Sequence, residues 1–176
     1  MLTREDIAQA KLIRNRQQQH INETYSQRQQ NQETWAAWKE ACADFHQTRV
    51  ATDYLWSDKV RLKIKNGDRE VINDALLYLE VDPWYFRSGY LKERLIDALK
   101  SAPLTNEDVN RIQNIIINIA GGPNRREFRR FCQLAARVTS PEFEELLVQL
   151  AKEHDPGGKL AYLLRYLEEH KEVHQH

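Results

Sequence analysis

Hydrophobic and polar positions divide the chain into a polar N-terminal part and a second part with regular apolar stripes. Neither glycine nor proline occurs between residues 3 and 66. Beyond residue 66 these residues recur at short intervals, at Gly67, Pro83, Pro103, Gly121-Gly122-Pro123, Pro141 and Pro156-Gly157-Gly158. Because glycine and proline commonly end helices, the pattern predicts a long helical arm over residues 1–66, followed by several short helices.

The arm begins with a strong helix-start signal and then loses its apolar face. Thr3 and Asp6 have the spacing of a capping box, and Leu2 with Ile7 has that of a hydrophobic staple. Between residues 14 and 34 the only sizeable hydrophobic residues are Ile21 and Tyr25, among many glutamines. Such a stretch has little to bury, so we expect it to be exposed, frayed or docked on something outside this chain.

The second half of the arm carries a stripe of large residues with alternating spacings of three and four. Its members are Trp35, Trp38, Cys42, Phe45, Arg49, Thr52 and Trp56. We expect this helical face to pack on the chain's own helices rather than in an intermolecular coiled coil. A single helix over residues 4–65 would be about 90 Å long at 1.5 Å per residue, so we favour two helices meeting near residues 29–32 over one bent helix.

The end of the arm admits two interpretations. Val60, Leu62 and Ile64 alternate with basic residues before Asn66-Gly67, as in a strand that enters a tight hairpin. The alternation does not continue after Gly67. We therefore predict a helix that ends at Asn66-Gly67.

From Arg69 onward, apolar positions recur with a period of 36 residues. The three 36-residue segments that start at Arg69, Thr105 and Pro141 each contain two predicted helices joined by a turn. The positions in register are Leu76, Ile112 and Val148; Leu79, Ile115 and Ala151; and Leu95, Phe131 and Leu167. Each pair buries only one side of itself, so neighbouring pairs must stack to complete a core.

In length and layout, residues 69–171 resemble HEAT-like helical repeats. The resemblance implies a curved helical surface that binds partners, and it implies no catalytic residues. The predicted fold is all-α, with the arm followed by a domain of stacked antiparallel helix pairs over residues 67–171 and a disordered tail over residues 172–176. An irregular helical bundle is the alternative.

Composition and motifs exclude most chemical functions. Lys plus Arg and Asp plus Glu number 26 each, so the chain has no net charge that would attract nucleic acid or an anionic membrane. No nucleotide-binding, nucleophile or zinc motif occurs, and we expect no catalytic residue, no metal and no cofactor. His20 with Glu23 and His170 with His174 are each at most half a metal site. Cys42 and Cys132 are expected to be reduced core residues, and a cytoplasmic location is expected because no apolar leader begins the chain.

The densest aromatic segment is the first candidate site. Asp82 and Pro83 have the residue types of a helix N-cap and first helical position, which predicts a helix from Pro83. Four aromatic residues follow within residues 84–90 and cannot all be buried on one stripe. We predict a partner-binding site at Trp84, Tyr85, Arg87 and Tyr90, since Trp, Tyr and Arg dominate interface energetics. Gly89 within this helix indicates a close approach by another part of the chain.

A run of arginines is the second candidate site. Arg126, Arg129, Arg130 and Arg137 fall on one side of a predicted helix, opposite Phe131 and other apolar residues. Guanidinium groups suit phosphates, so this arginine ridge predicts nucleic-acid binding as the alternative function. The ordinary explanation is a solvated face paired with Glu142, Glu144 and Glu145.

The sequence favours a non-enzymatic interaction or adaptor protein whose partner is another protein. A homo-oligomer formed through the arm is a further possibility. Some HEAT-like proteins are DNA-repair glycosylases, and that enzymatic variant would need an acidic residue beside an aromatic cleft, for which Asp82 with Trp84 is the one candidate.

Overall fold

The computed structural model describes residues 1–153, 155 and 158–170, and within these residues it contains helices and no strand. The all-α prediction is therefore confirmed. The elements are α1 (Arg4–Gln27), α2 (Gln32–Gln47), the 3-10 helix η1 (Ala51–Trp56), α3 (Asp58–Lys65), α4 (Arg69–Val81), α5 (Ser88–Leu99), α6 (Asn106–Gly121), α7 (Phe128–Val138), α8 (Pro141–Glu153) and α9 (Lys159–His170). No described helix is both long enough and apolar enough to cross a bilayer.

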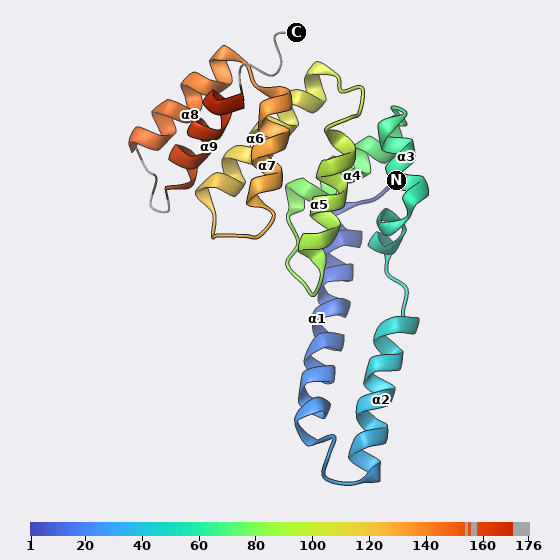
Figure 1. Ribbon diagram of the computed structural model, residues 1–176. Coiled ribbons are helices and arrows are strands. Elements are labelled where there is room, and N and C mark those ends of the chain that lie inside the picture. The colour runs from blue at the N-terminus through green and yellow to red at the C-terminus, as the bar shows by residue number, and fades with distance from the viewer. Residues whose placement is uncertain (154, 156–157, 171–176) are drawn as a thin grey trace.

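Helices α1 and α2 form an antiparallel hairpin that projects from the remaining helices (Figure 1). The capping box is present, because the Thr3 hydroxyl accepts from the Asp6 amide at 3.1 Å and the Asp6 carboxylate accepts from the Thr3 amide at 3.0 Å. The chain reverses direction at residues 28–31. Asn31 caps α2 by accepting from the Thr34 amide at 2.9 Å. The predicted break near residues 29–32 is therefore present, but residues 1–66 hold η1 and α3 in addition to the two long helices.

The prediction that one helical stripe runs from Trp35 to Trp56 is wrong, because α2 ends at Gln47. The guanidinium of Arg14 on α1 donates to the carbonyls of Phe45 at 2.8 Å and Thr48 at 3.2 Å. These carbonyls are hydrogen-bonded to α1, so the end of α2 has a partner outside its own helix. The chain then continues through η1.

The tryptophan-rich half of the arm also packs elsewhere than we expected. Trp38 lies 5.0 Å from Trp35 and 6.1 Å from Tyr25 between ring centroids, near the α1–α2 turn and away from the helix pairs. Helix α2 makes its main contacts with α1. The base of α1 joins the arm to α4, since the Leu2 amide donates to the buried Asp74 carboxylate at 2.7 Å.

The polar stretch of α1 is covered in part by α2 of the same chain. Arg14 and Gln17 are both 8% exposed. The Gln17 amide donates to the Asp44 carboxylate at 2.9 Å. The most polar stretch of the arm is thus partly docked on its own second helix, a partner that the sequence analysis did not identify.

Helices α4 to α9 pack as consecutive pairs. Contacts occur within the pairs α4–α5, α6–α7 and α8–α9, and between equivalent helices, α4 with α6, α5 with α7 and α7 with α9. These contacts are consistent with stacked helix pairs (Figure 1). The positions predicted in register are buried except Val148, which is 39% exposed, and Ala151, which is half-buried, so the third pair departs from the period.

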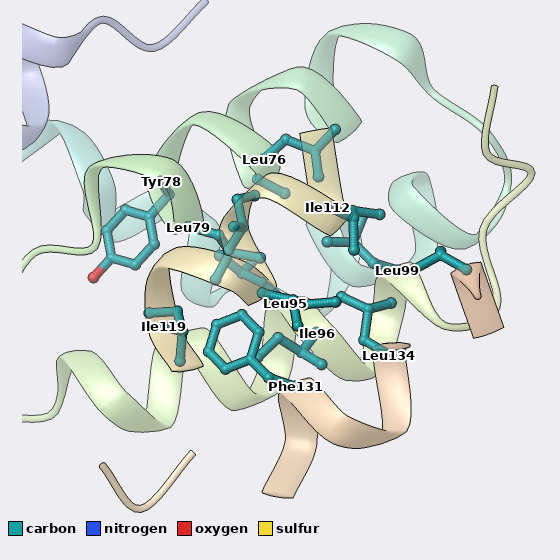
Figure 2. Packing of buried hydrophobic residues seen from close by; sticks show 14 of the residues in the cluster. Leu76, Tyr78, Leu79, Leu95, Ile96, Leu99, Ile112, Ile119, Phe131 and Leu134 are labelled. Atoms are coloured by element: carbon teal, nitrogen blue, oxygen red, sulfur yellow. The ribbon is translucent and has the colours of Figure 1, made fainter. Parts of the chain in front are cut away.

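The hydrophobic core extends from the base of the arm through the three helix pairs, and Figure 2 shows its part in the first two pairs. Leu76, Ile112 and Phe131 have no exposed surface, and Leu95 is 2% exposed. Both cysteines are free thiols, as expected, and Cys132 lies in this core. The prediction that Cys42 is a core residue is wrong, because it is only half-buried on α2. Helix α3 ends at Lys65, and Gly67 has a φ of 84°, which confirms the helical interpretation of Asn66-Gly67.

Candidate functional site: an aromatic cleft at the base of the arm

A cleft of about 430 Å³ lies where the arm meets the helix pairs. Asn15 and Gln18 of α1 line one side, residues 84–90 line the second, and Arg126 with Glu127 lines the third. Three aromatic side chains in this aromatic cleft are solvent-exposed: Trp84 by 62%, Phe86 by 53% and Tyr90 by 48%. The cleft brings together Trp84, Arg87 and Tyr90 of the predicted site and adds Phe86.

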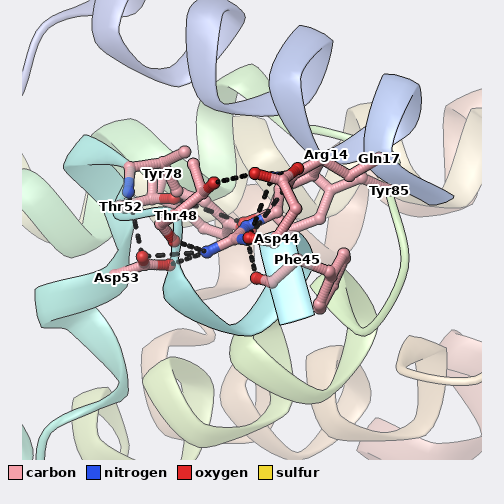
Figure 3. A network of polar contacts seen from close by, with 10 residues as sticks. Arg14, Gln17, Asp44, Phe45, Thr48, Thr52, Asp53, Tyr78 and Tyr85 are labelled. Atoms are coloured by element: carbon pink, nitrogen blue, oxygen red, sulfur yellow. Dashed lines mark hydrogen bonds and ion pairs between the residues drawn. The ribbon is translucent and has the colours of Figure 1, made fainter. Parts of the chain in front are cut away.

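Tyr85, the fourth residue of the predicted site, points the other way. It is 9% exposed, and its hydroxyl lies 2.7 Å from that of Tyr78 and 3.4 Å from that of Thr52 (Figure 3). Burial raises the pKa of Tyr78 far above its usual range, so this hydroxyl stays neutral. Tyr85 also lines the cleft, and the contacts of its hydroxyl with Tyr78 and Thr52 fix residues 82–87 to the core.

The backbone of residues 82–87 is held in a strained form. Asp82 has a φ of 49° and Arg87 a φ of 68°, both in the left-handed region. The prediction that a helix starts at Pro83 is wrong: Asp82 ends α4, and α5 starts at Ser88. The Asp82 carboxylate binds Lys92 at 2.5 Å and Arg125 at 2.5 Å, so it is unavailable as an N-cap.

Beneath the aromatic cleft lies a buried group of charges. Lys92 has no exposed surface, and its ammonium lies 3.5 Å from the carboxylate of Glu127, which is also fully buried. Neither oxygen of Glu127 has a hydrogen bond from the described residues. A Cβ at Gly89 would lie 3.2 Å from Glu127 Oε2, so the close approach expected at Gly89 is made by this side chain.

A second network joins α1, the end of α2 and η1 within the arm, and the hydroxyls of Thr52 and Tyr85 link it to the loop (Figure 3). The Arg14 guanidinium binds both oxygens of Asp53, at 3.0 Å and 2.9 Å. Both bonds come from the single nitrogen Nη2, so they are charge-assisted but are not the parallel two-nitrogen contact of a guanidinium fork. The Phe45 ring, 4.9 Å below the Arg14 guanidinium, lies 5.9 Å from Phe86. Phe86, one of the exposed aromatic side chains of the cleft, therefore contacts this network through Phe45.

A second groove of about 320 Å³ continues from the aromatic cleft, and both are lined by Tyr85, Phe86 and Arg87. We call it the basic groove, because it is lined by three arginines and one carboxylate, Asp53. Arg14 pairs with that carboxylate. Arg49 and Arg87 are exposed and have no acidic partner among the described residues. The accessible charge of the groove is therefore positive.

The arginine ridge is only partly free. Arg126 lies 3.2 Å from Glu93 and stacks on Tyr90 at 3.9 Å, and Arg130 lies 3.5 Å from Asp97. The carboxylates that pair with Arg126 and Arg130 come from α5, not from the start of α8 where we expected them. In the part of the chain that the structure describes, Arg129 and Arg137 are exposed without an ion pair.

No cluster of three or more His, Cys, Asp or Glu that could hold a metal occurs among the described residues. His174 and the tail predicted as disordered (residues 172–176) lie outside the described residues. Comparison with known proteins finds no matching family model, no matching curated sequence and no matching solved structure.

Proposed function

We propose that this chain is a non-enzymatic adaptor that binds a segment of a protein partner in the aromatic cleft. The observation that carries the proposal is the exposure of Trp84, Phe86 and Tyr90 in one cleft beside arginine side chains. Aromatic residues and arginine are enriched among residues that dominate binding energies. Exposed apolar residues on a monomeric protein are usually scattered singly, whereas here three large aromatic rings lie on one short segment.

The rigidity of the loop supports the same proposal. Its backbone is strained at Asp82 and Arg87, and it is held by Tyr85 on one side and by Lys92 and Arg125 on the other. A site already held in its binding conformation loses less entropy when a partner binds. The resemblance to HEAT-like repeats, whose helical surfaces bind partners, is in keeping with this use, and a cytoplasmic location belongs to the same proposal.

Site-specific photo-crosslinking tests the proposal. A photoreactive phenylalanine analogue replaces Trp84 in one sample and Leu62 in another. Leu62 is the matched control, because it is 55% exposed on α3 and does not line the cleft. We expect position 84 to capture a discrete protein that position 62 does not. Identical products from the two positions would argue against the cleft.

The second candidate function is binding of nucleic-acid phosphates through the arginine ridge. The observation in its favour is that Arg129 and Arg137 have no ion pair within the described residues. Against it, Glu93 and Asp97 lie beside Arg126 and Arg130 and reduce the positive charge. Binding of a fluorescent oligonucleotide that weakens steeply with salt, and is lost in the R129Q/R137Q variant, would support this function. The hypothesis of a glycosylase activity is not supported at its candidate acidic residue, because Asp82 is paired with Lys92 and Arg125.

A further inference from the structure

The aromatic cleft and the basic groove form one continuous surface with two different chemistries. They meet at Phe86 and Arg87, which line both. The cleft side presents exposed aromatic rings, and the groove side presents the unpaired cations Arg49 and Arg87. A ligand that covers both must offer an apolar group to one half and negative charge to the other.

We propose that the occupant is a polypeptide segment that places an aromatic or large apolar side chain in the cleft and Asp or Glu carboxylates in the basic groove. This inference rests on the proposed function and names the chemistry of the partner.

Charge complementarity carries the inference. Of the four charged residues that line the basic groove, Arg14 and Asp53 neutralise each other at 2.9 Å. The remaining two are both arginines, and the Arg87 guanidinium lies 5.4 Å from the centroid of the Trp56 ring, which also lines the groove. On the cleft side, the exposed charged residues of the lining are Arg87 and Arg126, and Arg126 lies 3.2 Å from Glu93. No accessible carboxylate faces the ligand among the residues that line either half, since Glu127 is fully buried and Asp53 is bound to Arg14.

Arg87 adds a second argument. It has a φ of 68°, in the left-handed region that residues other than glycine rarely adopt because the Cβ approaches the backbone too closely. Glycine at this position would remove the strain. The segment nevertheless presents an exposed arginine there, which suits a function for its side chain. The positive φ also makes Arg87→Gly a useful variant, because this substitution removes the charge without introducing backbone strain.

Selection from a phage-displayed library of random 12-residue peptides tests the inference. Selection is run in parallel against the full wild-type chain and against the R49E/R87E variant. We expect wild-type binders to combine an aromatic residue with Asp or Glu, and the charge-reversed chain to select Lys or Arg at the same positions. Failure to enrich binders on the wild-type chain, or the same charge pattern on both chains, would overturn the inference.

The best wild-type binder is then measured as a fluorescein-labelled peptide by anisotropy. Arg87→Gly should weaken binding about 5- to 10-fold, as expected for loss of one charged contact, while the variant melts at the wild-type temperature or above. Leu62→Ala is the control and should leave the affinity unchanged. An unchanged affinity in Arg87→Gly would refute the role of the charge. Tighter binding of labelled oligo(dT) than of the peptide would refute the choice of partner.

The two proposals fail separately. If Trp84→Ala abolishes peptide binding while R49E/R87E leaves it unchanged, the aromatic cleft binds the peptide but the basic groove does not bind its carboxylates. If Trp84→Ala leaves both peptide binding and crosslinked partner binding unchanged, the proposed function itself is wrong.

Discussion

Replacement of Lys92 by methionine should destabilise the fold strongly, because Lys92 links three segments from beneath the aromatic cleft. Its ammonium, on α5, lies 2.5 Å from Asp82 at the end of α4 and 3.5 Å from Glu127 before α7. Methionine preserves most of the volume of the side-chain stem. Asp82 keeps its pair with Arg125 at 2.5 Å, but Glu127 loses the cation nearest to its buried carboxylate.

The magnitude follows from that difference. Removing one partner of a buried ion pair costs about 3–5 kcal/mol, mostly because the other charge is left buried and unpaired. Glu127→Gln in the Lys92→Met background removes the stranded charge. The double variant should therefore be more stable than Lys92→Met alone, and the two free-energy changes should be non-additive.

Urea unfolding followed by circular dichroism measures these differences. Lys39→Met is the matched control, since Lys39 is exposed on α2, and it should change the free energy of unfolding by less than about 0.5 kcal/mol. A cost below about 1 kcal/mol for Lys92→Met would refute the assignment of Lys92 as the central cation. Strict additivity in the double variant would refute the coupling with Glu127.

Three further predictions follow from individual sites. Gly121→Ala should raise the melting temperature, because a Cβ at this position meets no atom within 4 Å. Gly89→Ala should lower the melting temperature or leave it unchanged, because its Cβ would lie 3.2 Å from Glu127. Differential scanning calorimetry compares the two variants. Ellman's reagent at pH 8 should modify Cys42 in the native protein and Cys132 only after unfolding, since burial raises the pKa of Cys132 to about 12; rapid modification of both thiols would contradict this. Burial opposes ionisation of Asp108, yet Arg69 at 2.8 Å and Thr105 hold its pKa below the usual value, so its contribution to stability is present at neutral pH and is lost as pH falls below about 4. In the Asp108→Asn variant, the free energy of unfolding should therefore fall less steeply as the pH is lowered through the acid range. The same pH dependence as in the wild type would refute the assignment.

Local signals in the sequence predicted the elements whose causes are local. The Thr3–Asp6 capping box, the helix end at Asn66-Gly67 and the helix-helix turn around Gly121-Gly122 each depend on residues within a few positions of one another. Apolar spacing likewise predicted the buried faces that hold Leu76, Ile112 and Phe131. Propensity and periodicity act over the same short range, so these predictions held.

Two of the failed predictions involve partners distant in sequence. Helix α2 ends at Gln47 with no Gly or Pro present, where Arg14, more than 30 positions earlier, binds the carbonyls of Phe45 and Thr48. Asp82 has the residue type of an N-cap, but Lys92 and Arg125 bind its carboxylate.

The candidate site was predicted in part for the same reason. The aromatic density of residues 84–90 was visible in the sequence, and Trp84 and Tyr90 are indeed exposed. The burial of Tyr85 depends on Tyr78 and Thr52, and the basic groove depends on the arm folding back to bring Arg49 beside Arg87. Nothing in the local sequence marks either contact. The one available sequence signal was the opposite charge of Arg14 and Asp53, whose ion pair holds α1 beside η1 in the folded chain.

The most direct test of the proposed function is the affinity of the protein captured at position 84, measured by isothermal titration calorimetry against Trp84→Ala and Leu62→Ala. Because Trp84 is 62% exposed, its truncation should leave the fold intact. The proposal predicts that Trp84→Ala weakens binding at least 30-fold, the loss of about 2 kcal/mol typical of a dominant interface residue, and that Leu62→Ala matches the wild type. Equal affinities for all three chains would contradict it.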